Sequence, residues 1–450
     1  DQASNTISLK NLETYIIGSN SYVQWDDSAI NSGDGGARNS FWGPTEKLLY
    51  GYSGSVFYAQ KLTNSGSNFT GMSTSDNLKY VGNEGQQSLN LNIDRTSYTG
   101  NFNISLGDGN DSINSAKFTN SDSLDAGAGD DNIYIMVGGG SGTPALSSFN
   151  MAKLDGGAGS DTLSFTESTT GGAELNLTLG GAVNFENLNG TSASETIRGD
   201  SGNNILTGSN GVDTIYGGSG NDTLKADDLW GGGMDGGNSA GYQSDNDKLY
   251  GEAGDDTLIA NQGDNILDGG TGADTITSGS GSDTLVLRLG DGGNTIADAD
   301  TVTDFTDATD VLGLDDGLQY TDLIIAQGTG DNANDTIISS GSEYLAILQG
   351  IDVSNINYMD FASMATGDLS FTGTTGDDVF IGAAGTDTVT TNIGNDVVLS
   401  SSGDDVITVD GFGNKTIDGG AGTDSITINL SGHTSLTDFG ISYANETFTF

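Results

Sequence analysis

The amino-acid sequence predicts an all-β fold in which many short strands are joined by tight turns. Two observations come from composition: Gly accounts for 72 of the 450 residues and Pro for only 2, while apolar residues still make up 34%. This balance separates the chain from collagen and from disordered acidic tails. The third observation is a repeat of nine residues that recurs at constant spacing from Gly190 onward.

The charge balance is strongly acidic. The chain has 62 acidic and 13 basic residues and a formal net charge of -49; 10 of the acidic residues are Glu, which leaves 52 Asp. Because Glu is the better helix former, this excess of Asp favours turns and sites for hard cations. Bound cations would offset the self-repulsion of a folded state. The same charge repels phosphate, so we expect no nucleic-acid partner.

The chain contains no Cys, which excludes disulfides and thiolate metal sites and leaves calcium as a candidate for stabilising a secreted fold. No apolar run approaches the roughly 18 residues of a membrane span, so we expect no membrane insertion. The sequence begins at Asp1 without a leader pattern, and we expect it to be an excerpt of a longer protein.

Residues 1–105 contain no copy of the repeat. Alternating apolar residues in SLNLNID from Ser88 and in NFNISL from Asn101 predict β-strands. The region is either a separate sandwich or an irregular start of a solenoid. It carries clustered aromatic residues that suit either a core or a sugar-stacking platform: Tyr22, Trp25, Phe41, Trp42, Tyr50, Tyr52, Phe57 and Tyr58.

Fifteen nine-residue blocks follow the pattern G-G-x-G-x-D-x-U-x, where U is a large apolar residue. Nine of them make up residues 190–286, which an insertion at 231–241 interrupts, and six make up residues 373–427 with Val409 as one extra residue. Residues 106–189 hold only single copies separated by longer polar stretches. We expect this part to be a solenoid with insertions.

Each position of the repeat suits a distinct role. Gly at the first, second and fourth positions allows positive φ and close backbone approach, and the sixth position places a short carboxylate at the end of the turn. Carbonyl and carboxylate oxygens suit calcium rather than zinc. The eighth position is expected to point inward, and it is filled by Ile197, Leu206, Ile215, Leu224, Leu249, Leu258, Leu267, Ile276, Leu285, Phe380, Val389, Val398, Ile407, Ile417 and Ile426.

These blocks resemble the calcium-binding nonapeptide repeats of the RTX (repeats-in-toxin) family. The resemblance implies a parallel β-roll in which six residues turn, three form a strand, and two repeats make one coil. It also implies calcium between the turns of adjacent coils, at roughly nine sites in the three uninterrupted arrays. The metal-binding residues that it indicates are Asp111, Asp131, Asp161, Asp213, Asp222, Asp247, Asp256, Asp274, Asp283, Asp378, Asp387, Asp396, Asp405, Asp424, Gly218, Gly220, Gly270, Gly272, Gly420 and Gly422.

Four blocks depart from the pattern at the sixth position. Glu195, Asn204 and Asn265 replace the Asp, and Lys415 occupies the position in the fourteenth block. We expect weak or absent calcium sites at these turns, with the lysine as a candidate substitute for an ion. The isolated copies around Asp111, Asp131 and Asp161 either bind calcium or are turns without metal.

Residues 287–372 resemble the module that often follows such arrays. A β cap is expected there, because the last coil leaves an open strand edge and half-formed ion sites. A second roll follows at residues 373–427. Residues 428–450 are expected to be a terminal strand region or the start of a further module.

The sequence favours a protein that is not an enzyme. The single histidine, His433, excludes the H-E-x-x-H motif of zinc proteases. One G-x-S-x-G match, at residues 237–241, lies in the insertion between repeats rather than between a strand and a helix, where a hydrolase would need it.

The resemblance further implies type I secretion from a Gram-negative bacterium and folding outside the cell, where calcium is abundant. We expect an extracellular structural protein, such as a surface-layer, matrix, filament or adhesin segment, which self-associates as calcium rises. Two alternatives stay open: a module that binds carbohydrate or another cell surface, and a polysaccharide-modifying enzyme with its active site in residues 1–189.

Overall fold

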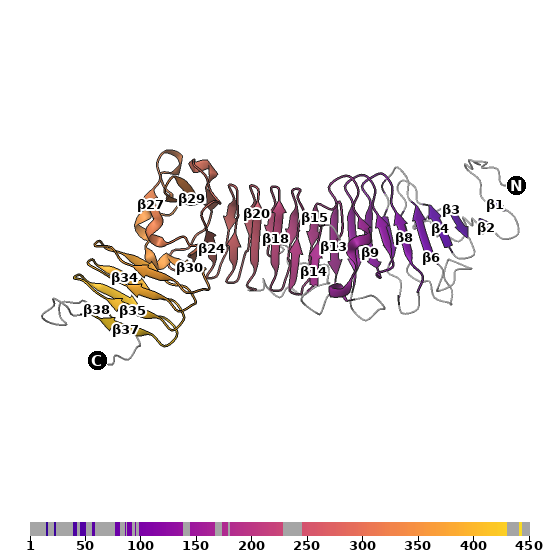
Figure 1. Ribbon diagram of the computed structural model, residues 1–450. Helices are drawn as coiled ribbons and strands as arrows, with labels where there is room; N and C mark the ends of the chain where they lie inside the picture. Colours follow the sequence, from indigo (N-terminus) through magenta and orange to yellow (C-terminus); the bar gives the residue numbers. More distant parts are fainter. Residues whose placement is uncertain are drawn as a thin grey trace. The chain divides into compact units, whose positions relative to one another are not determined.

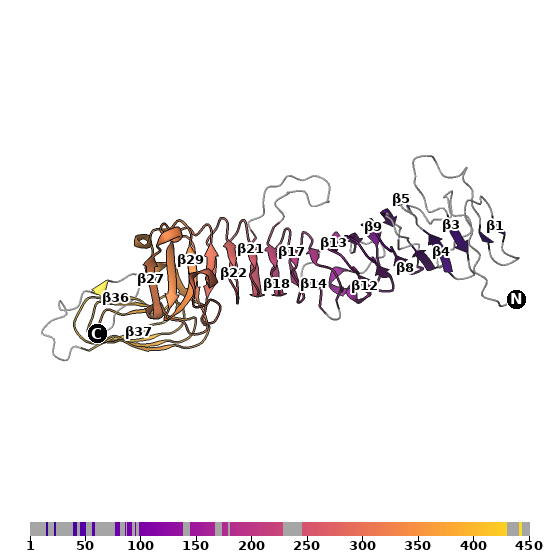
Figure 2. The same ribbon diagram turned by 90° about the horizontal axis from the view of Figure 1, so that it is seen from above.

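The computed structural model describes residues 99–137, 145–166, 173–178, 181–227 and 245–429, short strands between residues 15 and 91, residues 86 and 95, and a strand at 441–442. The chain divides into two compact units, unit 1 of residues 1–243 and unit 2 of residues 244–450. Figure 1 and Figure 2 show that each unit is built from successive short strands that lie side by side. In the described part of the chain, no helix is long and apolar enough to cross a membrane.

Unit 1 places alternate strands in different sheets. Strands β1 to β4 pair antiparallel with their neighbours, and from β4 onward the parallel pairs join strands two apart in the chain. One sheet of the unit contains β1 (Tyr15–Ile16), β2 (Tyr22–Val23), β3 (Asn39–Trp42), β4 (Glu46–Tyr50), β6 (Asn77–Val81), β8 (Phe102–Ser105), β10 (Ser123–Asp125) and β12 (Leu154–Asp155). The others contain β5 (Val56–Tyr58), β7 (Ser88–Leu91), β9 (Ser112–Lys117), β11 (Asn132–Met136), β13 (Thr162–Thr166), β15 (Asn187–Asn189), β17 (Ile205–Thr207) and β19 (Thr223–Lys225), and β14 (Ala173–Asn176), β16 (Glu195–Arg198) and β18 (Thr214–Ser219).

The sheets of unit 1 continue past residue 105, where the region without repeats is expected to end. β6 pairs with β8 and β7 pairs with β9, so strands on both sides of that residue share the same sheets. The 3₁₀ turns η1 (Leu146–Ser148) and η2 (Met151–Lys153) lie in a longer connection before β12. Insertions therefore lengthen the connections without interrupting the stacking of the strands.

Unit 2 continues the same alternation. One group contains β20 (Lys248–Ala253), β22 (Ile266–Asp268), β24 (Thr284–Leu287), β26 (Val311–Leu314) and β30 (Phe361–Ser363), and a second contains β21 (Thr257–Ile259), β23 (Thr275–Thr277), β25 (Asp300–Val302), β29 (Glu343–Leu348), β28 (Thr336–Ser340) and β27 (Leu323–Gln327). Two four-stranded sheets follow, β31 (Ser370–Thr372), β33 (Thr388–Thr390), β35 (Val406–Val409) and β37 (Ser425–Ile428), and β32 (Val379–Ile381), β34 (Asp396–Leu399), β36 (Lys415–Asp418) and β38 (Ile441–Ser442).

Residues 287–372 first extend the sheets of unit 2 and then change their pattern. β25 and β26 pair in parallel with β23 and β24, whereas β28 pairs antiparallel with both β27 and β29. Single 3₁₀ turns join these strands: η3 (Ile296–Asp298), η4 (Tyr320–Asp322), η5 (Gly330–Asn332), η6 (Val353–Asn355) and η7 (Tyr358–Asp360). The antiparallel pair lies at the edge of its sheet, where it gives the parallel strands a hydrogen-bonded neighbour.

Within the repeat arrays, the core is a row of residues at the eighth position of successive repeats. Fourteen of the fifteen eighth-position residues are buried, and Ile426 is half-buried. Register explains this, because Leu249, Leu267 and Leu285 stand opposite one another in adjacent parallel strands. The predicted all-β parallel β-roll is confirmed. One inward residue per three-residue strand makes the core thin, so burial of apolar area contributes little per coil.

Candidate metal centres

The glycine turns of successive coils stack directly on one another. Gly270 and Gly272 have φ values of +89° and +144°, and a Cβ at either position would clash with the carbonyl oxygen of Glu252 or Gly254 in the turn 18 residues earlier. The other predicted glycines, Gly218, Gly220, Gly420 and Gly422, also have positive φ and meet backbone of the preceding turn. A side chain at these six positions would collide with the preceding turn, so each of them requires glycine.

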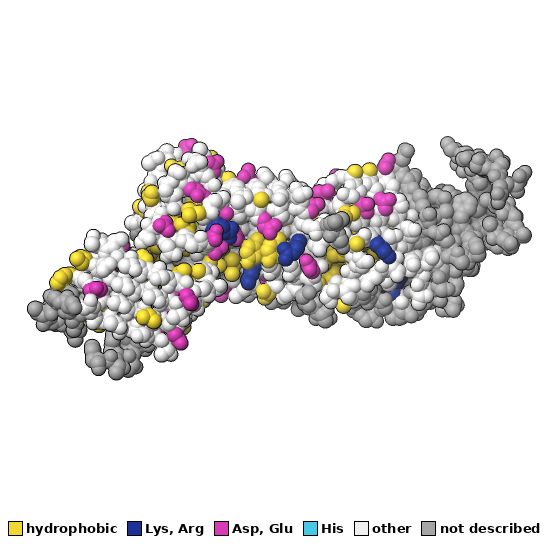
Figure 3. Space-filling model, viewed as in Figure 1, with side chains coloured by type: hydrophobic (Ala, Val, Ile, Leu, Met, Phe, Trp, Pro, Cys, Tyr) yellow, Lys and Arg dark blue, Asp and Glu magenta, His cyan; other side chains and the backbone are white. Residues whose placement is uncertain are grey.

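The sixth-position carboxylates point into the molecule. Thirteen of the fourteen predicted aspartates are buried, and Asp424 is half-buried. On the face seen in Figure 3, the visible acidic side chains are instead scattered over the surface. The buried set therefore differs from the exposed acidic residues that account for much of the net charge.

Most of these carboxylates use one oxygen to accept a backbone N–H of the neighbouring coil. Oδ1 of Asp274 accepts the backbone N–H of Asp256 at 2.7 Å, and Oδ1 of Asp405 accepts that of Asp387 at 2.7 Å. The isolated copies do the same, since Asp131 accepts from Asp111 at 2.6 Å and Asp161 from Asp131 at 2.7 Å. Further bonds of this kind reach Asp213, Asp222, Asp283, Asp396 and Asp424.

The second oxygen of several of these carboxylates is buried without a hydrogen-bond partner. This holds for Oδ2 of Asp131, Asp161, Asp274, Asp283, Asp405 and Asp424. An unpaired, buried carboxylate oxygen costs several kcal/mol, on the order of the penalty for burying an uncompensated charge. A cation beside these oxygens would remove that cost.

Burial also shifts the protonation of these groups. Loss of solvation raises the pKa of Asp131 and of Asp161 to about 7. The same cause raises the pKa of Asp274 and of Asp283 to about 6. Backbone N–H groups that donate to the carboxylates only partly oppose the effect.

The donor set fits calcium. Among the described residues, no three carboxylate, imidazole or thiol groups gather in one place. The oxygens that the stacked turns offer to an ion are those of the buried carboxylates and of the backbone carbonyls. Hard oxygen donors of this kind are the ligands that calcium prefers. The sixth-position Asp and the carbonyls of the stacked glycine turns would hold the ion, whose charge would offset that of the buried carboxylates.

In two of the predicted turns, Oδ2 of the aspartate accepts a hydrogen bond within its own turn. Oδ2 of Asp378 accepts the N–H of Thr374 at 2.6 Å, and Oδ2 of Asp387 accepts that of Ala383 at 2.8 Å. In both turns the donor is the second residue of the same repeat. In these two turns Oδ2 is hydrogen-bonded within the same repeat, which distinguishes them from the turns whose Oδ2 has no hydrogen-bond partner.

The turns that depart from the repeat pattern supply their own hydrogen bonds. Glu195 accepts the N–H of Thr191 at 3.1 Å, and Oδ1 of Asn204 accepts that of Asp200 at 2.8 Å. The Nδ2 amide of Asn265 donates to the carbonyl of Gly263 at 3.1 Å and to Asp283 at 3.1 Å. An amide hydrogen thus occupies space beside a carbonyl and a carboxylate.

Sequence reasoning missed several acidic residues that join the same stacks. Asp300 and Asp310 accept the N–H groups of Asp274 and Asp283 at 3.0 and 3.1 Å, although no glycine turn precedes them. Asp122 accepts the N–H of Phe102 at 2.7 Å in the same manner. Their shared signal is an Asp two residues before a buried apolar strand residue, as in Asp300 and Val302.

Stacked glycine turns, most of which end in a buried carboxylate, define a parallel β-roll. The family model of the RTX calcium-binding nonapeptide repeat matches residues 118–134, 189–224, 243–267, 250–285, 259–296 and 372–407. The chain therefore carries RTX calcium-binding repeats, as the sequence predicts, and repeats of this family bind calcium. No curated protein matches the chain significantly.

One similar solved structure is the crystal structure of the extracellular lipase LipA from Serratia marcescens. It shares 17% identity with this chain over 43% of the chain, at a TM-score of 0.20. The match spans only 40% of the lipase chain. The G-x-S-x-G match at residues 237–241 and His433 both lie outside the described residues.

Proposed function

We propose that this protein is an extracellular, calcium-dependent structural protein of a bacterial cell surface. The observation that carries the proposal is the set of buried carboxylates whose second oxygens lack partners beside stacked turn carbonyls. Such a site is poorly satisfied without a cation. Calcium would supply the missing positive charge and link oxygens of adjacent coils.

The same features make folding depend on calcium. The chain contains 72 glycines and carries a net charge of -49, and many strands of the repeat arrays bury a single apolar residue. Apolar burial of that size does not offset the loss of backbone entropy. At low intracellular calcium the chain would stay unfolded and suited to type I secretion, and it would fold outside at affinities of about 10⁻⁴ to 10⁻³ M.

Long arrays of stacked repeats support the structural part of the proposal. A solenoid presents an extended surface on which partners can bind. We propose that the folded chain self-associates into a surface layer, matrix or filament. The proposed partners are calcium and further copies of this chain.

A calcium titration tests both parts. Circular dichroism and light scattering would be recorded on the same samples, with magnesium as the control. A calcium-specific rise in β signal together with scattering supports folding and assembly. Folding without scattering at millimolar calcium contradicts assembly, and the absence of any calcium response overturns the calcium-dependent fold.

A further inference from the structure

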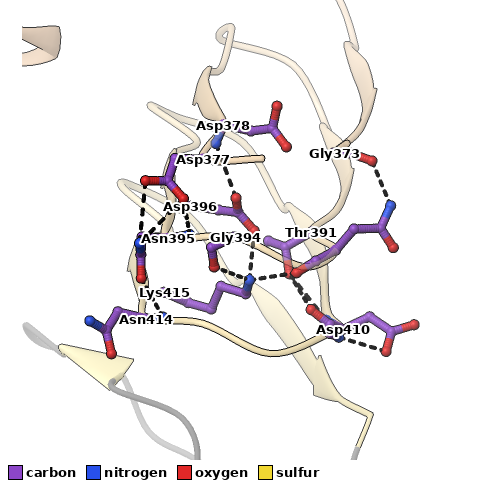
Figure 4. Close-up of polar contacts among 12 residues, drawn as sticks. Gly373, Asp377, Asp378, Thr391, Gly394, Asn395, Asp396, Asp410, Asn414 and Lys415 are labelled. Carbon is purple, nitrogen blue, oxygen red and sulfur yellow. Dashed lines mark hydrogen bonds and ion pairs between the residues drawn. The ribbon is translucent and has the colours of Figure 1, made fainter. Parts of the chain in front are cut away.

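Lys415 is a fully buried lysine at a position that the repeat reserves for aspartate. Its ammonium donates to the carbonyl oxygens of Asn392 and Gly394, the latter at 2.7 Å, and pairs with Oδ2 of Asp396 at 2.7 Å (Figure 4). Both members of the pair are buried, with side-chain exposures of 0% and 2%. The ammonium thus lies in an all-oxygen environment of two carbonyls and one carboxylate.

The three acceptors are the parts of a turn that the repeat pattern assigns to an ion. Asn392, Gly394 and Asp396 are the second, fourth and sixth residues of the twelfth repeat. Lys415 itself belongs to the adjacent coil, because β34 and β36 pair with Asp396 opposite Lys415. The ammonium therefore joins turns of two neighbouring coils, as the RTX resemblance implies for calcium.

The charges at facing sixth positions are consistent with lysine taking the place of a calcium ion. Two aspartates at facing sixth positions carry -2, which one divalent cation neutralises. A lysine facing an aspartate carries no net charge, so the site needs no metal. On the other side of the same roll, Asp405 and Asp424 face each other with unpartnered Oδ2 atoms.

A second chain cation meets a turn carboxylate in unit 1. Arg95 and Asp122 are both buried, with the guanidinium 3.1 Å from both carboxylate oxygens. Asp122 lies outside the fifteen nine-residue blocks, yet it accepts the N–H of Phe102 in the neighbouring strand as sixth-position carboxylates do. Both units thus contain a turn in which a side chain supplies the positive charge.

We propose that Lys415 is a covalently attached replacement for calcium, which locks the coils of the twelfth and fourteenth repeats together at low calcium. The proposal rests on the proposed function, since it assumes that the intact turns bind calcium. One side of the second roll would then be held by lysine and the other by metal. The lysine side would form first as calcium rises and offer a template for the rest.

The first test converts the lysine site into a metal site in the full chain. Lys415→Asp should bind one more calcium ion than the wild type, counted by native mass spectrometry at saturating calcium. Lys248→Met, at an exposed lysine of the first roll, should leave the count unchanged. A folded Lys415→Asp protein with the wild-type number of ions would overturn the proposal.

A second variant covers the case in which Lys415→Asp does not fold. Lys415→Met keeps the apolar stem, and hydrogen exchange of β34 and β36 would be followed against calcium concentration. The calcium needed for half protection should rise by about tenfold or more, because Asp396 loses its buried partner. An unchanged midpoint refutes the lysine proposal alone, whereas a wild type without any calcium dependence refutes the proposed function.

Discussion

Replacing Asp405 by Asn would separate the structural and the ionic role of a turn carboxylate. Asn keeps an oxygen that accepts the N–H of Asp387, a bond of 2.7 Å in the native protein. It removes the charge and replaces the buried, unpartnered Oδ2 by an amide. Asn265 shows the expected outcome, since its amide donates to the carbonyl of Gly263 two residues earlier.

The substitution should change the metal-free stability and the calcium-dependent part of the stability in opposite directions. Without calcium, removal of an unsatisfied buried oxygen should stabilise the second roll by about 1 to 3 kcal/mol. At about 10 mM calcium and an affinity of about 10⁻⁴ to 10⁻³ M, one site contributes about 1.4 to 2.7 kcal/mol. The calcium-dependent part of the stability should shrink by that amount.

Hydrogen exchange of β35 and β37 as a function of calcium measures both effects, and native mass spectrometry counts the ions. Asp404→Asn is the matched control, because Asp404 is exposed and its Oδ1 only accepts the N–H of Thr423 at 2.9 Å. Equal ion counts and equal calcium midpoints for the two variants would refute the assignment of Asp405 as a ligand.

Three further predictions concern packing, backbone and pH. Leu267→Ala should lower the free energy of unfolding by about 2 to 5 kcal/mol, whereas Leu289→Ala, at an exposed leucine, should change it by no more than about 0.5 kcal/mol. Equal effects of the two substitutions would contradict the inward orientation of the eighth position. Gly272→Ala should disrupt stacking and lower the calcium affinity. The control is Gly317→Ala, where φ is +83° and space is open, and it should cost only about 1 to 3 kcal/mol of backbone strain. A calcium midpoint unchanged by Gly272→Ala would argue against the stacked-carbonyl site. In EDTA, the contribution of Asp161 to stability should be present below pH 4 and lost as pH rises through its raised pKa of about 7. Thermal melts recorded against pH in EDTA measure this loss, and melts that show no loss would contradict the prediction.

Proton binding and calcium binding oppose each other at these carboxylates. A protonated carboxyl tolerates burial but does not ligate calcium, so acid should weaken calcium binding as it stabilises the metal-free turn. The protein therefore has two ways to neutralise a buried turn. Its own side chains provide a third, as Lys415 does for Asp396.

The repeat pattern is sufficient to predict the roll and the orientation of its residues. A period of nine with one strand per repeat brings equal positions into register, which is why Leu249, Leu267 and Leu285 are buried in a row. Glycine at the second and fourth positions indicates positive φ, because other residues are strained there. The positive φ is a local property that a single repeat already contains, whereas the register follows from repetition of that unit at a constant spacing.

Tertiary structure decided which carboxylates remain unsatisfied. Asp378 and Asp387 fit the pattern as well as Asp405 does, yet Oδ2 of each accepts an N–H within its own turn. Asp300 and Asp310 join the stacks across 26 and 27 residues, a separation that no period indicates. The reason is physical: the repeat encodes the conformation of a turn, whereas hydrogen bonds, burial and charge at its carboxylate depend on the coil stacked against it.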